Sequence, residues 1–251
     1  MPRLLILRTG STAREVLARH GDYDRWFTGA MGGLDARFEV RDLVRGESPV
    51  PDGHDGILVT GSTSSAYLEE AWMPPLITLL RRAESLPIPL LGICFGAQML
   101  AQARGGRVVL NPFGWEIGAV PIEITSAGAD DPLLAGLPSS FTALATHEDH
   151  IESLPPGAVA LARNQAAPVQ AFRACPRVWG VQFHPELSTE ALDELIRLRR
   201  PQLEADALAH GKPVDGHVER LRSTLTNPDA LQTRCVLRNF VRICAEVSSR
   251  A

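Results

Sequence analysis

A cysteine stands between two glycines where an apolar run gives way to a helical pattern. Cys94 follows the apolar run 89–91, lies between Gly92 and Gly96, and precedes the helix-like stretch 99–103. A strand-to-helix turn of this kind, a nucleophile elbow, is so tight that Cβ atoms beside the nucleophile would clash, which explains the glycines. The N-terminal end of the helix favours the thiolate, the nucleophilic form of cysteine. The alternative is a small buried side chain with no chemical role.

A histidine and a glutamate end the second segment, residues 181–186. His184 closes an apolar run, and Glu186 follows two residues later. In an extended chain, residues i and i+2 point to the same side, so Glu186 can orient the imidazole while the other ring nitrogen faces a thiol. This is the nucleophile, base and orienting-group arrangement of the acyl-transfer triads, with cysteine as the nucleophile. A solvated strand end is the alternative for this segment taken by itself.

A third segment, the Ser/Thr-rich loop 61–67, directly follows the apolar run 56–60. A glycine-initiated turn at a strand end exposes backbone N–H groups, which acyl transfer needs where the tetrahedral oxyanion develops. One donor is expected from Gly61 and another from Phe95, just after the nucleophile. An ordinary polar turn is the alternative.

Taken together, the three segments resemble the class I (triad) glutamine amidotransferases. The resemblance covers about residues 4–186 and rests on Gly-Ile-Cys-Phe-Gly-Ala-Gln, Gln-Phe-His-Pro-Glu and the Gly-Ser loop, in the family's order and spacing. Within the family, the chain looks most like the stand-alone proteins described as GMP synthase-like. It departs from GMP synthetase domains at residues 146–149, Thr-His-Glu-Asp in place of Ser-His-Gly-Asp, and at 61–63, Gly-Ser-Thr in place of Gly-Gly-Pro.

The resemblance implies a role for each matching residue. It makes Cys94 the nucleophile, His184 the base and acid, and Glu186 the orienting group. The matching positions for the backbone oxyanion donors and for a residue that helps to hold the substrate glutamine are Gly61, Phe95 and Gln98.

Two polar clusters remain. His147 and Asp149 match a His-x-Asp segment that lines the family's site near the glutamine, although a solvated loop between two strands is the alternative. Residues 20–24, His-Gly-Asp-Tyr-Asp, either rim the mouth of the site or cap a helix, and we favour the cap.

Alternating strand-like and helix-like segments predict an α/β fold. The expected architecture is a mostly parallel central sheet flanked by helices, with extra antiparallel strands and a helical C-terminal extension, which is the flavodoxin-like fold of the resembled family. We expect one amidotransferase domain over residues 1–251, divided into a catalytic core, 1–188, and an extension, 189–251. The expected strands are 3–7, 38–43, 56–60, 90–93, 108–110, 118–124, 141–146, 158–162, 169–172 and 178–183, with a helix at 73–85.

Composition excludes several classes of partner. The chain has 251 residues, a formal net charge of −4 and a hydrophobic fraction of 45%, so neither nucleic acid nor an anionic membrane is expected as a partner. The short apolar run near Met1 suits a buried first strand, and a cytoplasmic location follows. The cysteines show no metal-site spacing, so we expect no metal and no organic cofactor. Three of the four are expected to be structural or incidental: Cys175, Cys235 and Cys244.

Three hypotheses follow. The first is a glutamine amidotransferase or glutaminase that hydrolyses the γ-amide of glutamine through Cys94, His184, Glu186 and a γ-glutamyl thioester, with any acceptor of the ammonia on a separate synthetase chain. The second is a hydrolase of γ-glutamyl peptides or amines, which attacks the same carbonyl. The third is a catalytically silent binding or regulatory module on the same fold.

Overall fold

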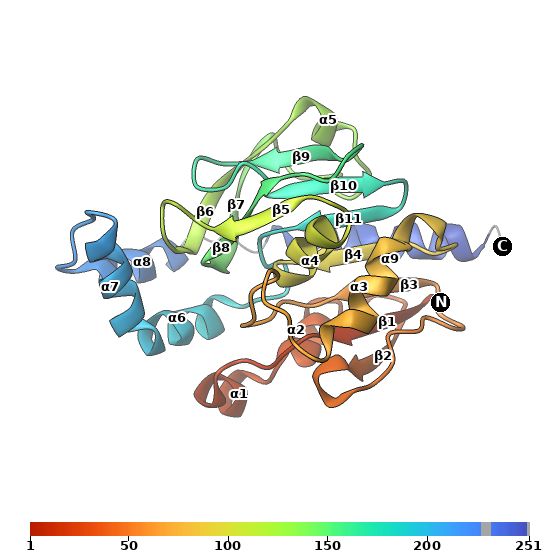
Figure 1. Ribbon diagram of the computed structural model, residues 1–251, viewed down its shortest axis with the longest axis horizontal. Coiled ribbons are helices and arrows are strands. Elements are labelled where there is room, and N and C mark those ends of the chain that lie inside the picture. The colour runs from red at the N-terminus through yellow and green to blue at the C-terminus, as the bar shows by residue number, and fades with distance from the viewer. Residues whose placement is uncertain (227–231, 250–251) are drawn as a thin grey trace.

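A nine-stranded sheet forms the centre of the computed structural model, which describes residues 1–226 and 232–249 (Figure 1). Five neighbouring strands pair in parallel, in the order β2 (Arg37–Asp42), β1 (Arg3–Arg8), β3 (Gly56–Val59), β4 (Leu90–Ile93) and β11 (Val178–Val181). The sheet continues antiparallel through β10 (Ala171–Cys175), β9 (Val159–Arg163), β6 (Glu116–Ile124) and β7 (Ser140–His147). A separate antiparallel pair joins β5 (Arg107–Leu110) to β8 (Asp149–Ser153). The parallel core with added antiparallel strands confirms the predicted architecture.

Helices cover both faces of the parallel strands, which explains why those strands read as continuous apolar runs. Successive residues of a strand point to opposite faces. Leu5 and Leu7 therefore pack toward α3 (Met73–Arg81) and α4 (Phe95–Ala103), whereas Leu4 and Ile6 pack toward α2 (Tyr23–Ala30) and α9 (Arg234–Ser248). The two clusters of buried side chains hold the strands in a rigid layer.

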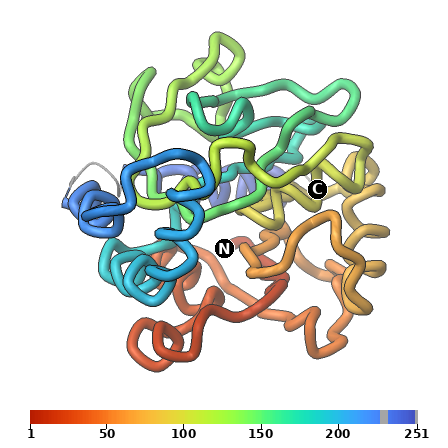
Figure 2. Tube along the Cα trace, turned by 60° about the vertical axis from the view of Figure 1, so that its left-hand side comes forward, coloured from red at the N-terminus to blue at the C-terminus, as the bar shows by residue number. Residues whose placement is uncertain are grey.

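The segment after residue 188 is helical, as expected, and has two parts. Helix α6 (Thr189–Leu198) packs against α1 (Arg14–His20), and α7 (Arg200–Ala209) and α8 (His217–Ser223) pack against α6 and against each other at one side of the molecule, whereas α9 returns to the sheet (Figure 2). The chain turns at Arg199, and Pro201 lies in the first turn of α7, where its missing N–H costs least. The rest of the extension, residues 227–231 and 250–251, lies outside the described residues.

Several elements differ from the expectation. The helix predicted at 73–85 ends at Arg81 and is followed by a 3₁₀ turn, Ala83–Ser85. Helix α1 and strand β8 were not predicted, because both are short and lack a clear apolar period. The remaining short elements are α5 (Ser126–Ala129) and the 3₁₀ turns Leu43–Arg45 and Thr224–Thr226.

No helix within the described ranges is both long enough and apolar enough to cross a lipid bilayer. All four cysteines are free thiols. Cys235 and Cys244 are buried in α9, and Cys175 ends β10.

The parallel pairing brings four strand ends to one edge of the sheet. Strands β1, β3, β4 and β11 run in the same direction, so the loops at their carboxyl ends lie together, at the edge where open α/β sheets bind ligands. The segments with candidate site residues, at Gly61, Cys94 and His184, follow directly on β3, β4 and β11.

Candidate active site

Cys94 occupies a strained turn between β4 and α4. Its backbone has φ 50° and ψ −106°, a region that residues with a side chain rarely adopt. Its N–H donates to the Val181 carbonyl at 2.8 Å, and its carbonyl accepts from the Gln98 N–H at 2.9 Å. A Cβ on Gly92 would lie 2.5 Å from the carbonyl carbon of Gly96. The expected tight turn is thus confirmed in its geometry.

His184 is held by Glu186. The imidazole Nδ1 lies 2.7 Å from Glu186 Oε1, and both side chains are buried. The i, i+2 geometry expected from the sequence is therefore present. Burial lowers the pKa of His184, but the Glu186 carboxylate and the neighbouring Cys94 sulfur outweigh it and raise the pKa to about 10. At neutral pH the ring is therefore an imidazolium beside the sulfur.

This raised pKa predicts an unusual pH profile. A raised histidine pKa keeps the proton on the ring as the pH rises, so proton donation by His184 should persist until about pH 10, far above the ordinary value of about 6.5. We expect kcat/KM to stay level through neutral pH and to fall only near pH 10. In Glu186→Gln, which removes the stabilising charge, the alkaline limb should move down by about one pH unit or more. An alkaline limb that lies near pH 6.5 in the native protein, or that does not move in the variant, would contradict this electrostatic account.

The backbone of Gly61 lies against Cys94 and His184. A Cβ built on Gly61 would be 3.2 Å from His184 Cε1 and 3.8 Å from Cys94 Cβ, so its backbone comes close to the sulfur-bearing turn. Phe95 is the first residue of α4, and the first N–H groups of a helix have no intrahelical acceptor. The two backbone positions expected to stabilise an oxyanion therefore flank Cys94.

The three residues matched to substrate contacts lie in a buried network beside the turn. Gln98 Nε2 donates to the Asp149 carbonyl at 2.9 Å. That carbonyl also lies 2.9 Å from His147 Nδ1, whose Nε2 lies 2.8 Å from Glu116 Oε2. The Asp149 carboxylate accepts from the Tyr67 hydroxyl at 2.9 Å. None of Gln98, His147 and Asp149 lines the cavity at Cys94.

Gln182 connects this network to the cysteine. Its Oε1 accepts from Gln98 Nε2 at 3.1 Å, and its own Nε2 donates to Cys94 Sγ at 3.5 Å. Gln182 was not among the residues predicted from the sequence, although it stands two residues before His184 in the Gln-Phe-His-Pro-Glu segment.

A small cavity opens beside the sulfur, with a volume of about 20 Å³. Its walls come from the loop after β1, from α2, from the loops after β3 and β11, from the turn after β4, from the end of β7 and from the C-terminal helices. The lining residues are Thr12, Tyr23, Trp26, Ser62, Cys94, Thr146, His184, Leu187, Leu195 and Arg199.

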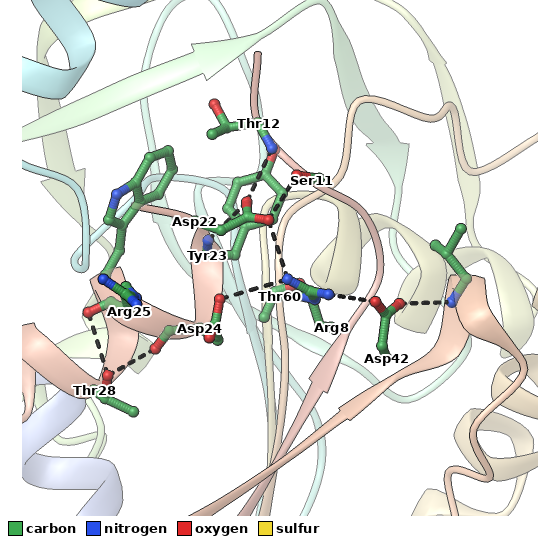
Figure 3. A network of polar contacts seen from close by, with 12 residues as sticks. Arg8, Ser11, Thr12, Asp22, Tyr23, Asp24, Arg25, Thr28, Asp42 and Thr60 are labelled. Atoms are coloured by element: carbon green, nitrogen blue, oxygen red, sulfur yellow. Dashed lines mark hydrogen bonds and ion pairs between the residues drawn. The ribbon is translucent and has the colours of Figure 1, made fainter. Parts of the chain in front are cut away.

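An acidic network positions the N-terminal wall of this cavity (Figure 3). Asp22 caps α2 by accepting from the Tyr23 N–H at 3.0 Å, and it also accepts from the Thr12 N–H at 3.0 Å. Arg8 lies 3.1 Å from Asp22 and also pairs with Asp42. The favoured helix cap at residues 20–24 is thus confirmed, and Tyr23 lines the cavity as well.

No group of three or more His, Cys, Asp or Glu residues in the described part of the chain is arranged to hold a metal ion.

The groups at Cys94 can act by nucleophilic acyl transfer. A cysteine beside an imidazolium, with backbone N–H donors close by, is suited to attack on an amide carbonyl and protonation of its leaving nitrogen. The fold is thus that of an α/β protein whose candidate site has the groups that cysteine-based acyl transfer requires.

Comparisons with known proteins agree with this class. The family model of class-I glutamine amidotransferases matches residues 37–198, more than half of the chain. The chain therefore belongs to the class-I glutamine amidotransferase family, a family of enzymes.

The matches cover very different shares of the relatives' own lengths. It is 25% identical to γ-glutamyl peptidase 5 of Arabidopsis thaliana over 96% of this chain and 95% of that protein. It is 33% identical to the glutamine-hydrolysing GMP synthase of Synechococcus sp. over 74% of this chain, but spans only 32% of that enzyme. A glutamine amidotransferase structure from Thermotoga maritima, 22% identical, covers 98% of both chains with a TM-score of 0.75, which shows the shared fold.

Proposed function

We propose that this protein hydrolyses the amide bond at the γ-carbonyl of a γ-glutamyl group, with glutamine as the first expected substrate. The observation that carries the proposal is the meeting of three groups at one sheet edge. Cys94 lies in a strained turn, His184 is ion-paired to Glu186 at 2.7 Å, and the backbone of Gly61 lies against both.

In the proposed reaction, the Cys94 thiolate attacks the γ-carbonyl carbon and forms a C–S bond. Backbone N–H groups of Gly61 and Phe95 stabilise the oxyanion. The C–N bond breaks as His184 gives its proton to the leaving nitrogen. The neutral ring then takes a proton from water, whose oxygen attacks the thioester, and the thiolate leaves as glutamate is released.

The leaving group defines two candidate activities. If the substrate is glutamine, ammonia leaves, and its acceptor would be a separate synthetase chain. The second candidate is hydrolysis of γ-glutamyl peptides or amines. The full-length similarity to γ-glutamyl peptidase 5 favours this candidate, because GMP synthase is matched over only about a third of its length. Both activities use the same groups at Cys94.

A substrate panel separates these candidates. Glutamate release is measured from glutamine, γ-glutamylglycine and γ-glutamylmethylamide, with the Cys94→Ala variant beside the native protein. Turnover of glutamine with release of ammonia supports the glutaminase, whereas faster turnover of the peptide or the amide supports the peptidase or amine hydrolase. Failure to release glutamate from any of the three would overturn the proposed function and favour a silent binding module.

A further inference from the structure

An arginine from the C-terminal helices lines the cavity at Cys94. Arg199 stands at the turn between α6 and α7, one residue beyond the match to the family model, which ends at residue 198. Of the residues that line the cavity, all of them described, Arg199 alone carries a permanent charge. It is half-buried.

Neutral groups hold this guanidinium in place. Its Nη1 donates to Thr146 Oγ1 at 2.5 Å, and its Cζ lies 4.9 Å from the ring centroid of Trp115. Among residues 1–226 and 232–249, no carboxylate forms an ion pair with it. The arginines on either side are paired, Arg197 with Asp193 and Arg200 with Glu204. Arg199 is thus left without a carboxylate partner next to the candidate nucleophile.

Such an arginine is suited to bind an anion that enters the cavity. Burial lowers the pKa of Arg199, and nearby Tyr23, Cys94 and Glu148 oppose this shift. The guanidinium is therefore partly desolvated but has no carboxylate bound to it. The planar guanidinium matches a carboxylate with two parallel hydrogen bonds, and such charge-assisted bonds are strong where water is displaced.

We infer that Arg199 is a specificity residue that binds a carboxylate of the substrate. The inference rests on the γ-glutamyl substrate proposed above. Such substrates offer a carboxylate in two places, the α-carboxylate of the glutamyl group and the carboxylate of an amino acid in the leaving group. A guanidinium binds either carboxylate in the same way, and binding measurements with matched ligands distinguish the two.

The size of the cavity implies that one of its walls moves when a substrate binds. At about 20 Å³ it has room for about one water molecule, so a γ-glutamyl group fits only if a wall moves. Arg199 can move without breaking an ion pair, because its contacts to Thr146 and Trp115 are to neutral groups. Substrate binding therefore replaces these contacts with a carboxylate.

Binding to a Cys94→Ala background tests this inference without turnover. Calorimetry compares L-glutamine with 4-aminobutanamide, which lacks the α-carboxylate, and γ-glutamylglycine with γ-glutamylmethylamide, which lacks the second carboxylate. Each is measured with Arg199 intact, with Arg199→Met, and with Arg197→Met as the matched control. Arg197 is exposed and absent from the cavity, so its variant should bind like the background.

If the α-carboxylate is the ligand, Arg199→Met should weaken L-glutamine about 10- to 100-fold and leave 4-aminobutanamide unchanged. If the leaving group supplies it, Arg199→Met should weaken γ-glutamylglycine and leave L-glutamine and the methylamide unchanged. The inference is overturned if Arg199→Met changes none of these affinities, if it weakens 4-aminobutanamide as much as L-glutamine, or if no γ-glutamyl compound binds. Binding that depends on Arg199, with no glutamate release by the native protein, would refute the proposed hydrolysis alone.

Discussion

Replacing Cys94 with alanine is expected to reduce glutamate release by about 10⁴-fold or more, because no other group at the site can form the thioester. The fold should survive. The change removes one sulfur atom that borders the cavity and accepts a hydrogen bond from Gln182 Nε2. The free energy of unfolding should change by about 1 kcal/mol or less. Steady-state kinetics and urea denaturation measure the two effects.

Cys175→Ala is the matched control, since this cysteine ends β10 and does not line the cavity. It should retain native activity. Substantial glutamate release by Cys94→Ala, or equal losses in both variants, would remove Cys94 from the mechanism.

The second large effect is on stability. Replacing Gly96 with alanine should destabilise the protein by about 3 kcal/mol or more, because the added Cβ would lie 2.5 Å from the carbonyl oxygen of Val59 in the central strand β3. Neither backbone can move without disturbing the packing of α4 on the sheet. Urea denaturation followed by circular dichroism measures the loss, and activity should fall with it because the same turn holds Cys94.

Gly29→Ala provides the comparison. Gly29 lies in α2 with no atom within 4 Å of an added Cβ, and alanine is the better helix former. This variant should be as stable as the native protein or slightly more stable. If Gly96→Ala unfolded at the same urea concentration as Gly29→Ala, the close packing at the elbow would be refuted.

The sequence predicts the framework of the site because its physics is local. Strands buried on both faces must be apolar throughout, so β1, β3 and β4 stand out in the sequence, and Gly92 and Gly96 mark a turn that tolerates no Cβ. The pairing of His184 with Glu186 needs only an extended chain between them. These features could be predicted from short windows of sequence.

The rest depends on contacts between distant segments. Arg199 reaches the cavity because α6 ends just before it, and no motif marks it. Gln182 meets Cys94 because β11 pairs with β4. His147 was matched to a substrate contact. Its imidazole instead lies against Glu116, which is 31 residues earlier in the sequence. Such long-range pairings cannot be derived from local patterns.

The most direct test of the account is to trap the acyl-enzyme. The native protein is mixed with γ-glutamyl substrate and quenched in acid at short times, and the intact mass and peptide masses are then measured. We expect a mass increase of one γ-glutamyl group on the peptide that contains Cys94, which disappears as substrate is exhausted and never forms in Cys94→Ala. Steady glutamate release with the adduct on another residue, or undiminished release by Cys94→Ala, would contradict it.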